Sequence, residues 1–242
     1  VSASLPAFME YPELVGSLPP GQALPSDYLK EMNSLVVVRI RRGPTSATIL
    51  EDNPNFFMIR RGAAVIQGIR FASSFFGKGQ FAGTKIERDG NSFVLKQELA
   101  ASYYQPLEPS QPVNAQNWMR LREQRRKTQT CRLEQIASIT EIESGFRLRV
   151  QTHGTTNVPV AVEIALRDGG RLDGCEKLET GSLLPTGGHA VYTAEGGTLR
   201  IGPGKADHKY IQLRGALPRM GDNSIYLTGF APFDHTVDFH CT

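Results

Sequence analysis

The stretch GFRLRVQTH at residues 145–153 decides the fold of this protein. Its apolar and polar residues alternate from Phe146 to Gln151, and a period of two is typical of a β-strand with one face in the core and one in water. The apolar members are Phe146, Leu148 and Val150, and the polar members are Arg147, Arg149, Gln151 and His153. The stretch therefore predicts a half-buried strand whose outward row carries two arginines and a histidine.

The same pattern recurs along most of the chain after residue 34, in short runs of β-branched and aromatic residues between glycines and prolines. We expect strands at 35–42, 45–51, 56–60, 63–72, 80–88, 92–100, 145–153, 158–167, 190–194, 198–201, 208–215, 224–230 and 235–241. Asp89-Gly90 predicts a hairpin, because glycine accepts the positive φ of a tight turn. Many short strands without a long helix predict an all-β fold, a large antiparallel two-sheet β-sandwich with few short helices.

Proline marks the expected domain boundary. The first thirty residues contain five prolines, which disfavour both helix interiors and central strands. We expect residues 1–30 to be a linker from a preceding domain and residues 31–242 to form one β-sandwich domain. Residues 117–135 are ambiguous, because Trp118 and its neighbours suit a short helix whereas residues 128–133 suit a strand.

Charge and hydropathy exclude several classes of protein. The chain has 27 Lys and Arg against 24 Asp and Glu, and its net charge of +3 gives no field that would favour nucleic acid as a partner. No apolar run approaches the roughly 18 residues that span a bilayer. The chain starts without methionine or a signal sequence, so we expect that an upstream segment was removed and that the protein is exported to the periplasm, the cell surface or the medium.

The cysteines and acidic residues do not predict a metal or cofactor site. Cys131, Cys175 and Cys241 match neither zinc nor redox spacing and could form at most one disulfide. Asp234, Asp238 and His240 would share one face of a strand, and the polarity of a terminal strand explains them without a metal ion. Glu163, which lies among apolar residues, is expected in a structural ion pair. We therefore expect no cofactor and no metal.

Several segments resemble a known family. They are RRGAAVIQGIRFASSFFGKGQF at 60–81, NVPVAVEIALRDGG at 157–170, DHKYIQLRGALP at 207–218 and IYLTGFAPFDHTV at 225–237. Together they resemble the C-terminal β-sandwich of heparinase II/III-like proteins, in which a helical toroid precedes a large sandwich similar to the supersandwich of polysaccharide lyases and to galactose mutarotase-like folds. The resemblance implies a carbohydrate-associated domain and a preceding helical domain as partner. It carries over no catalytic residue, so the catalytic residues stay unknown.

One expected strand suits sugar binding. Residues 208–214 would place His208, Tyr210, Gln212 and Arg214 on one face, with Ile211 and Leu213 on the other. Aromatic rings stack on sugar rings, amides bond hydroxyls, and arginine pairs with carboxylate or sulfate. Together with the outward row of residues 145–153, these residues give the predicted substrate-binding set His208, Tyr210, Arg214, Arg149 and His153. If the two strands were neighbours they would line a groove for an acidic sugar chain; the alternative is two unrelated solvated faces.

Two further segments have competing interpretations. A basic cluster at 120–132, next to Trp118, could bind anionic polysaccharide or an acidic surface of the preceding domain, or it could be a solvated face with Trp118 in a domain interface. The loop FFGKGQFAG at 75–83 is not a phosphate-binding loop, because Lys78 is followed by Gly79 and a strand-like segment. Its glycines predict a tight bend.

Three functions remain open. The first is a carbohydrate-associated β-sandwich domain of a heparinase II/III-like polysaccharide lyase acting on acidic glycans, with the isolated domain inactive. The second is a non-catalytic carbohydrate-binding module, and the third is a structural sandwich that supports a catalytic helical toroid. The expected partner is a polysaccharide or oligosaccharide, and the sequence fixes neither the glycan nor the oligomeric state.

Overall fold

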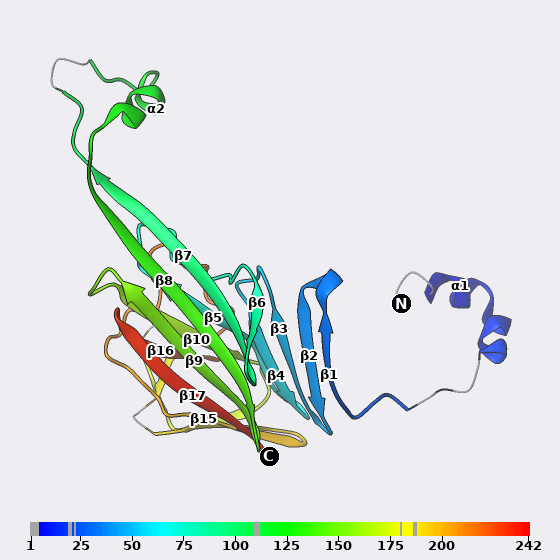
Figure 1. Ribbon diagram of the computed structural model, residues 1–242. Coiled ribbons are helices and arrows are strands. Elements are labelled where there is room, and N and C mark those ends of the chain that lie inside the picture. Colours follow the sequence, from blue (N-terminus) through cyan, green and yellow to red (C-terminus); the bar gives the residue numbers. More distant parts are fainter. Residues whose placement is uncertain (1–4, 19–20, 22, 109–111, 180, 186–187) are drawn as a thin grey trace.

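A computed structural model describes residues 5–18, 21, 23–108, 112–179, 181–185 and 188–242. Two twisted sheets pack face to face, as Figure 1 shows. In order across sheet A lie β1 (Asp27–Met32), β2 (Val37–Arg42), β3 (Thr45–Leu50), β4 (Phe57–Arg61), β5 (Ala64–Ser73), β10 (Pro159–Leu166), β16 (Ser224–Phe230), β13 (Leu183–Pro185) and β12 (Cys175–Lys177). In sheet B lie β11 (Arg171–Asp173), β14 (Ala190–Ala194), β15 (Gly197–Gly202), β17 (Phe233–Cys241), β9 (Gly145–Gly154), β8 (Lys127–Ile142), β7 (Ser92–Tyr104) and β6 (Ile86–Asp89).

The core lies between the sheets and is built by the alternation read from the sequence. Phe57 of sheet A meets Phe146 and Phe239 of sheet B edge to face, with ring centroids 5.9 and 6.2 Å apart. All three rings are almost fully buried, and each such side chain stabilises the fold by about 1.5–3 kcal/mol. The neighbouring strands are antiparallel, apart from the short parallel contact of β13 with β16. The predicted all-β, two-sheet sandwich is confirmed.

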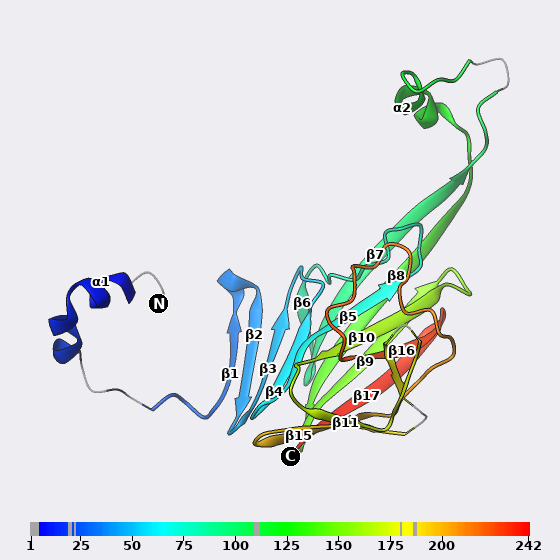
Figure 2. The ribbon, with the colours of Figure 1, turned by 180° about the vertical axis from the view of Figure 1, so that it is seen from behind.

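A long hairpin projects from this sandwich. Strand β7 pairs with β8 along its whole length, and at the far end the chain folds into the short helices α2 (Trp118–Leu121) and η4 (Arg122–Gln124). Figures 1 and 2 show that this end stands clear of the sheets. We call residues 92–142 the arm. Both interpretations of residues 117–135 are therefore correct in part, since a short helix precedes a strand.

The N-terminal region differs from the expected linker. The short helices α1 (Leu5–Glu10) and η2 (Pro12–Ser17) lie away from the sandwich in both views, and η3 (Asn33–Leu35) follows β1. Strand β1 begins at Asp27, inside the predicted linker, and pairs with β2 along its length. Pro19 and Pro20, on which the linker prediction partly depended, lie outside the described residues.

The expected strand at 208–215 is wrong. This segment belongs to an irregular stretch, residues 203–223, that lies across the outer surface of sheet A and that we call the strap. Leu213 is buried there beside Ala161 and Tyr226, while its neighbours Gln212 and Arg214 are exposed. The expected alternation of burial is therefore found from Tyr210 to Arg214, where one edge of the strap rests on an apolar part of the sheet, but it fails at His208, which is buried.

Other strand boundaries also differ from those predicted. Of residues 80–88, only the stretch from Ile86 belongs to a strand, whereas β8 continues well past the expected end at residue 133. The short strands β11, β12 and β13 were not expected. The Asp89-Gly90 hairpin is confirmed, with Gly90 at φ 56°. The three cysteines are unpaired thiols.

Candidate functional site

His208 is part of the packing of the strap. Its side chain is buried, its Nε2–H donates to the carbonyl of Gly229 at 2.8 Å, and its Nδ1 accepts the backbone N–H of Tyr210 at 3.1 Å. Both ring nitrogens are therefore used inside the protein. The Tyr210 ring lies 5.2 Å from the imidazole and is 65% exposed, so of these two residues only Tyr210 faces solvent.

Arg149 and His153 lie on the other side of the molecule, on the outer face of sheet B. Arg149 forms a two-pronged ion pair with Asp234 of β17 at 2.8 and 2.5 Å, and Arg147 pairs in the same way with Asp238. These hydrogen bonds hold the pKa of both aspartates below the ordinary value and raise the pKa of both arginines. The positive charges of Arg147 and Arg149 are therefore balanced by the negative charges of Asp238 and Asp234.

The predicted substrate-binding set is thus not brought together. His208, Tyr210 and Arg214 belong to the strap over sheet A, whereas Arg149 and His153 project from sheet B. Arg214 lies in an exposed turn that approaches the loop around Gly77. His153 lines a shallow cleft with Glu98 and Glu134, the latter directly opposite it on β8. The groove that would have joined the two strands does not form.

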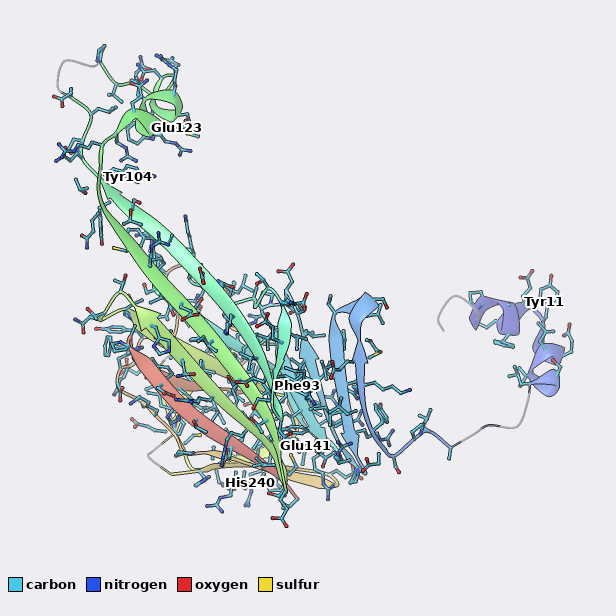
Figure 3. The ribbon with its side chains drawn as sticks, viewed as in Figure 1. Tyr11, Phe93, Tyr104, Glu123, Glu141 and His240 are labelled. Carbon is cyan, nitrogen blue, oxygen red and sulfur yellow. The ribbon has the colours of Figure 1, made fainter. Side chains whose placement is uncertain are left out.

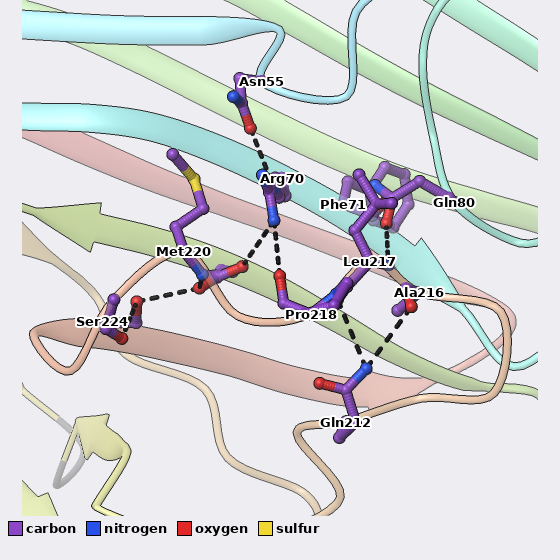
Figure 4. A network of polar contacts seen from close by, with 12 residues as sticks. Asn55, Arg70, Phe71, Gln80, Gln212, Ala216, Leu217, Pro218, Met220 and Ser224 are labelled. Atoms are coloured by element: carbon purple, nitrogen blue, oxygen red, sulfur yellow. Dashed lines mark hydrogen bonds and ion pairs between the residues drawn. The ribbon is translucent and has the colours of Figure 1, made fainter.

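Glu163 forms the expected structural ion pair. Its buried carboxylate accepts the N–H of Met220 at 2.7 Å and the hydroxyl of Ser224 at 2.9 Å, and it lies 4.0 Å from the Arg70 guanidinium. Arg70 also donates to the carbonyl of Pro218 at 2.7 Å. Figure 4 shows these contacts between sheet A and the strap. Burial and the Glu163 carboxylate raise the pKa of Tyr226 beside it. The network fixes the strap in place.

A basic surface lies on sheet A, over strands β1 to β4. Directly opposed residues of antiparallel neighbours share a face, and two rows of opposed residues point outward here. They are Lys30, Arg39, Thr48 and Met58 in one row, and Tyr28, Arg41, Ser46 and Arg60 in the next. Neither row contains a carboxylate, because the acids of β1, Asp27 and Glu31, point to the opposite side with Arg42 and Val38. We call these two rows the arginine face.

A cavity of about 340 Å³ opens on the arginine face. Arg39 donates to the hydroxyls of Ser46 and Thr48, and Arg60 Nε donates to the carbonyl of Gly62 at 3.0 Å. Arg167 joins the same cavity because its backbone N–H bonds the carbonyl of Val65 at 2.9 Å. Within the described ranges, none of these three guanidinium groups forms an ion pair. The arrangement can therefore bind an anion, with hydroxyl donors beside the cations.

Comparison with known proteins gives no match to a family model and none to a curated protein. Among solved structures, the chain aligns with a galactose mutarotase-like protein from Clostridium acetobutylicum at 7% identity and a TM-score of 0.38. The alignment covers 89% of this chain and 98% of that chain. The assignment of a β-sandwich rests on the two packed sheets themselves.

Neither a metal site nor a membrane-spanning helix is found in the part of the chain that the structure describes. Asp234 and Asp238 each form an ion pair with an arginine, and Nδ1 of His240 forms a hydrogen bond with the hydroxyl of Ser144 at 2.6 Å. The side chains that could have formed a metal site thus have protein partners.

The arginine face was missed because its members are far apart in sequence. Arg39 and Arg41 could have been found from the alternation in residues 35–42, which places them on the polar side of an expected strand. Arg60 and Arg167 join them only through the pairing of β3 with β4 and the contact at Val65. Neither the pairing nor the contact leaves a signal in a single sequence.

Proposed function

We propose that this chain binds an acidic glycan on the arginine face, with carboxylate or sulfate groups of the sugar held by Arg39, Arg60 and Arg167. One observation carries the proposal: three guanidinium groups that have no acidic partner among the described residues line one cavity together with two hydroxyls. Guanidinium forms paired hydrogen bonds to planar carboxylates and to sulfate oxygens, so this set fits anionic sugar substituents better than neutral rings. The cavity volume lies within the range of small-ligand sites.

The spacing of the cations suits an extended ligand. Strands β2 and β4 are separated by β3, so Arg39 and Arg60 emerge from backbones about 10 Å apart. A polymer with an anionic group on successive sugar units could contact both. Lys30 and Arg41 extend the positive surface toward the edge of the sheet, which would raise the local concentration of a polyanion before it binds.

The proposal includes a place in a larger enzyme. In β-elimination from a uronate, one group neutralises the carboxylate, a base removes the C5 proton and an acid protonates the leaving oxygen. The arginine face would supply the first role, and a preceding helical domain would supply the base and the acid. This is the arrangement expected for an exported heparinase II/III-like lyase.

A non-catalytic glycan-binding module is the second candidate. It is favoured by the lining of the cavity, which contains no histidine, tyrosine or carboxylate among the described residues. In this version the chain binds and turns over nothing. The two candidates differ in whether the protein that contains a helical domain before this chain releases unsaturated uronate, which is followed by its ultraviolet absorbance.

Calorimetry with purified chain tests the binding. We expect oligosaccharides of uronate or sulfated sugars to bind, and Arg60→Gln to weaken that binding at least 10-fold, since a charge-assisted hydrogen bond contributes about 1.5–3 kcal/mol. Arg147→Gln is the matched control, because this arginine is already paired with Asp238, and it should leave the affinity unchanged. Equal affinity of Arg60→Gln and the unmodified chain would overturn the proposal.

A further inference from the structure

A second cleft lies where the arm leaves the sandwich. Four segments far apart in sequence meet there: the loop 74–76, the arm through Tyr103 and Gln129, the loop 155–159, and the strap through Arg214. The cleft has a volume of about 560 Å³. We call it the aromatic cleft. It is separate from the arginine face, with which it shares no lining residue.

Aromatic rings form one wall of the cleft. Phe76 and Tyr103 pack edge to face with centroids 4.9 Å apart, although they are 38% and 55% exposed. The ring of the buried Phe75 packs against the ring of Phe76, with the two centroids 5.1 Å apart. Two large rings are thus held in fixed positions while their surfaces remain in water, where an apolar ligand surface could cover them.

The backbone holds this wall in an uncommon conformation. Phe76 and Asn157 both have positive φ, 51° and 58°, which non-glycine residues rarely adopt. Two backbone hydrogen bonds hold these loops. The N–H of Lys78 donates to the carbonyl of Phe75 at 2.9 Å, and the N–H of Asn157 donates to the carbonyl of Ala231 at 2.7 Å. Such conformations cost free energy and persist only where the surrounding structure holds them. They are concentrated at binding sites.

Glycine brings Arg214 to the cleft. Gly215 has φ +90°, and a Cβ at this position would lie 2.4 Å from the backbone of Gly77. The strap can therefore approach the loop that carries Phe76 this closely only with glycine at position 215. This contact places Arg214 on the rim of the cleft.

Polar side chains also line the aromatic cleft, and their hydrogen-bond donors and acceptors are available to a ligand. Along the described segments, the side chains of Gln129, Thr156 and Asn157 form no hydrogen bond to other protein groups, although all three line the cleft. Amides and hydroxyls can each donate and accept. The combination of an aromatic wall with free amides and hydroxyls matches the surface of a sugar ring, which has C–H groups on its faces and hydroxyls around its rim.

We propose that the aromatic cleft binds a neutral pyranose ring, with one C–H face of the sugar on Tyr103 and Phe76 and its hydroxyls bonded by Asn157 and Gln129. The ligand class is shared with the function proposed above, but the site and the chemistry are different: recognition here needs no negative charge. Arg214 on the rim would bond a ring or hydroxyl oxygen.

Uncharged probes test the aromatic cleft without involving the arginine face. The amide spectrum of the chain would be recorded by nuclear magnetic resonance during titration with cellotetraose, mannotetraose and xylotetraose. We expect at least one of them to shift the amides of residues 74–77 and 155–158, with a dissociation constant in the millimolar range or below. If none of the three shifts these amides, the inference is overturned, whatever the result for acidic glycans.

Two variants identify the contacts. Tyr103→Ala should weaken binding of the neutral probe at least 10-fold, while Tyr104→Ala, which removes the next ring of the same strand from a contact with Arg125, should not change it. Asn157→Gly suits the positive φ and should fold normally, yet it should weaken binding several-fold because the amide is lost. Unchanged affinity in Tyr103→Ala, or an equal loss in Tyr104→Ala, would contradict the inference.

Discussion

Burial determines the role of individual histidines in this protein. His208 and His235 both have polar neighbours in the sequence, yet His208 is buried between the strap and sheet A and His235 bonds the carbonyl of Pro203 at 2.9 Å. Desolvation lowers the pKa of His235 from its ordinary value, against a smaller opposing effect of that hydrogen bond. Folding therefore favours the neutral imidazole.

This pKa predicts how stability depends on pH. The unfolded chain protonates His235 near pH 6.5, whereas the folded chain resists protonation, so the unfolded state binds more protons below that pH. The contribution of the neutral His235 side chain to the free energy of unfolding is fully present above about pH 6.5 and is lost as pH falls below it. Urea unfolding of the unmodified chain and of His235→Gln at pH 7.5 and 5.5 measures it. We expect a smaller loss of unfolding free energy in His235→Gln; parallel losses would contradict the prediction.

At the scale of elements, the strap depends on a few buried polar contacts. It has little regular pairing with the sheet, and Glu163 and Arg70 between them bond the backbone at Met220 and Pro218. The loss of this buried carboxylate should destabilise the fold more than the loss of an exposed ion pair, because it leaves the Arg70 charge without its carboxylate and the Met220 N–H without its acceptor.

Removal of this carboxylate should release the strap. We expect Glu163→Ala to lower the free energy of unfolding by about 3 kcal/mol and to speed hydrogen exchange at Met220. The control is Asp222→Asn, since Asp222 is exposed on the same strap and pairs with Arg219 at the surface; its effect should stay within about 0.5 kcal/mol. Equal effects of the two substitutions, measured by urea unfolding, would disprove the role of Glu163.

At the scale of the whole molecule, the arm packs on the sandwich along its strands as far as Tyr103, which contacts Phe76, and its helical end stands clear. Figure 3 shows Tyr104 and Glu123 at its far end, clear of the sandwich, and Phe93 at the end that lies on the sandwich. At the far end Arg125 stacks over Trp118 and Tyr104 at 5.2 and 4.7 Å. At the near end Phe93 is part of the core between the sheets.

The two ends of the arm should contribute differently to stability. We expect Trp118→Ala to change the free energy of unfolding by less than about 0.5 kcal/mol, because the ring is partly exposed and stacks with Arg125 at the same end of the arm. Phe93→Ala should cost about 3–5 kcal/mol, since it opens a cavity in the core. Thermal unfolding of both variants decides this, and a large loss in Trp118→Ala would show that the far end packs on the sandwich.

The sequence alone determined the class of fold and the direction of many side chains. In residues 145–153, every apolar residue was placed inward and every charged residue outward, because a strand leaves its side chains only two directions. The rule failed for residues 208–215, where a segment without strand partners shows part of the same burial pattern over an apolar region of sheet A, with His208 buried rather than exposed.

Only the tertiary structure decided which outward residues became neighbours. Arg149 was correctly predicted on an outer face, but its pairing with Asp234 depends on the register of β9 and β17. Arg39, Arg60 and Arg167 gather around one cavity because β2, β4 and the end of β10 lie close together in sheet A, with only β3 and β5 between them. The physical reason is that alternation is a local property of the backbone, whereas adjacency depends on hydrogen bonds between strands that are distant in the chain.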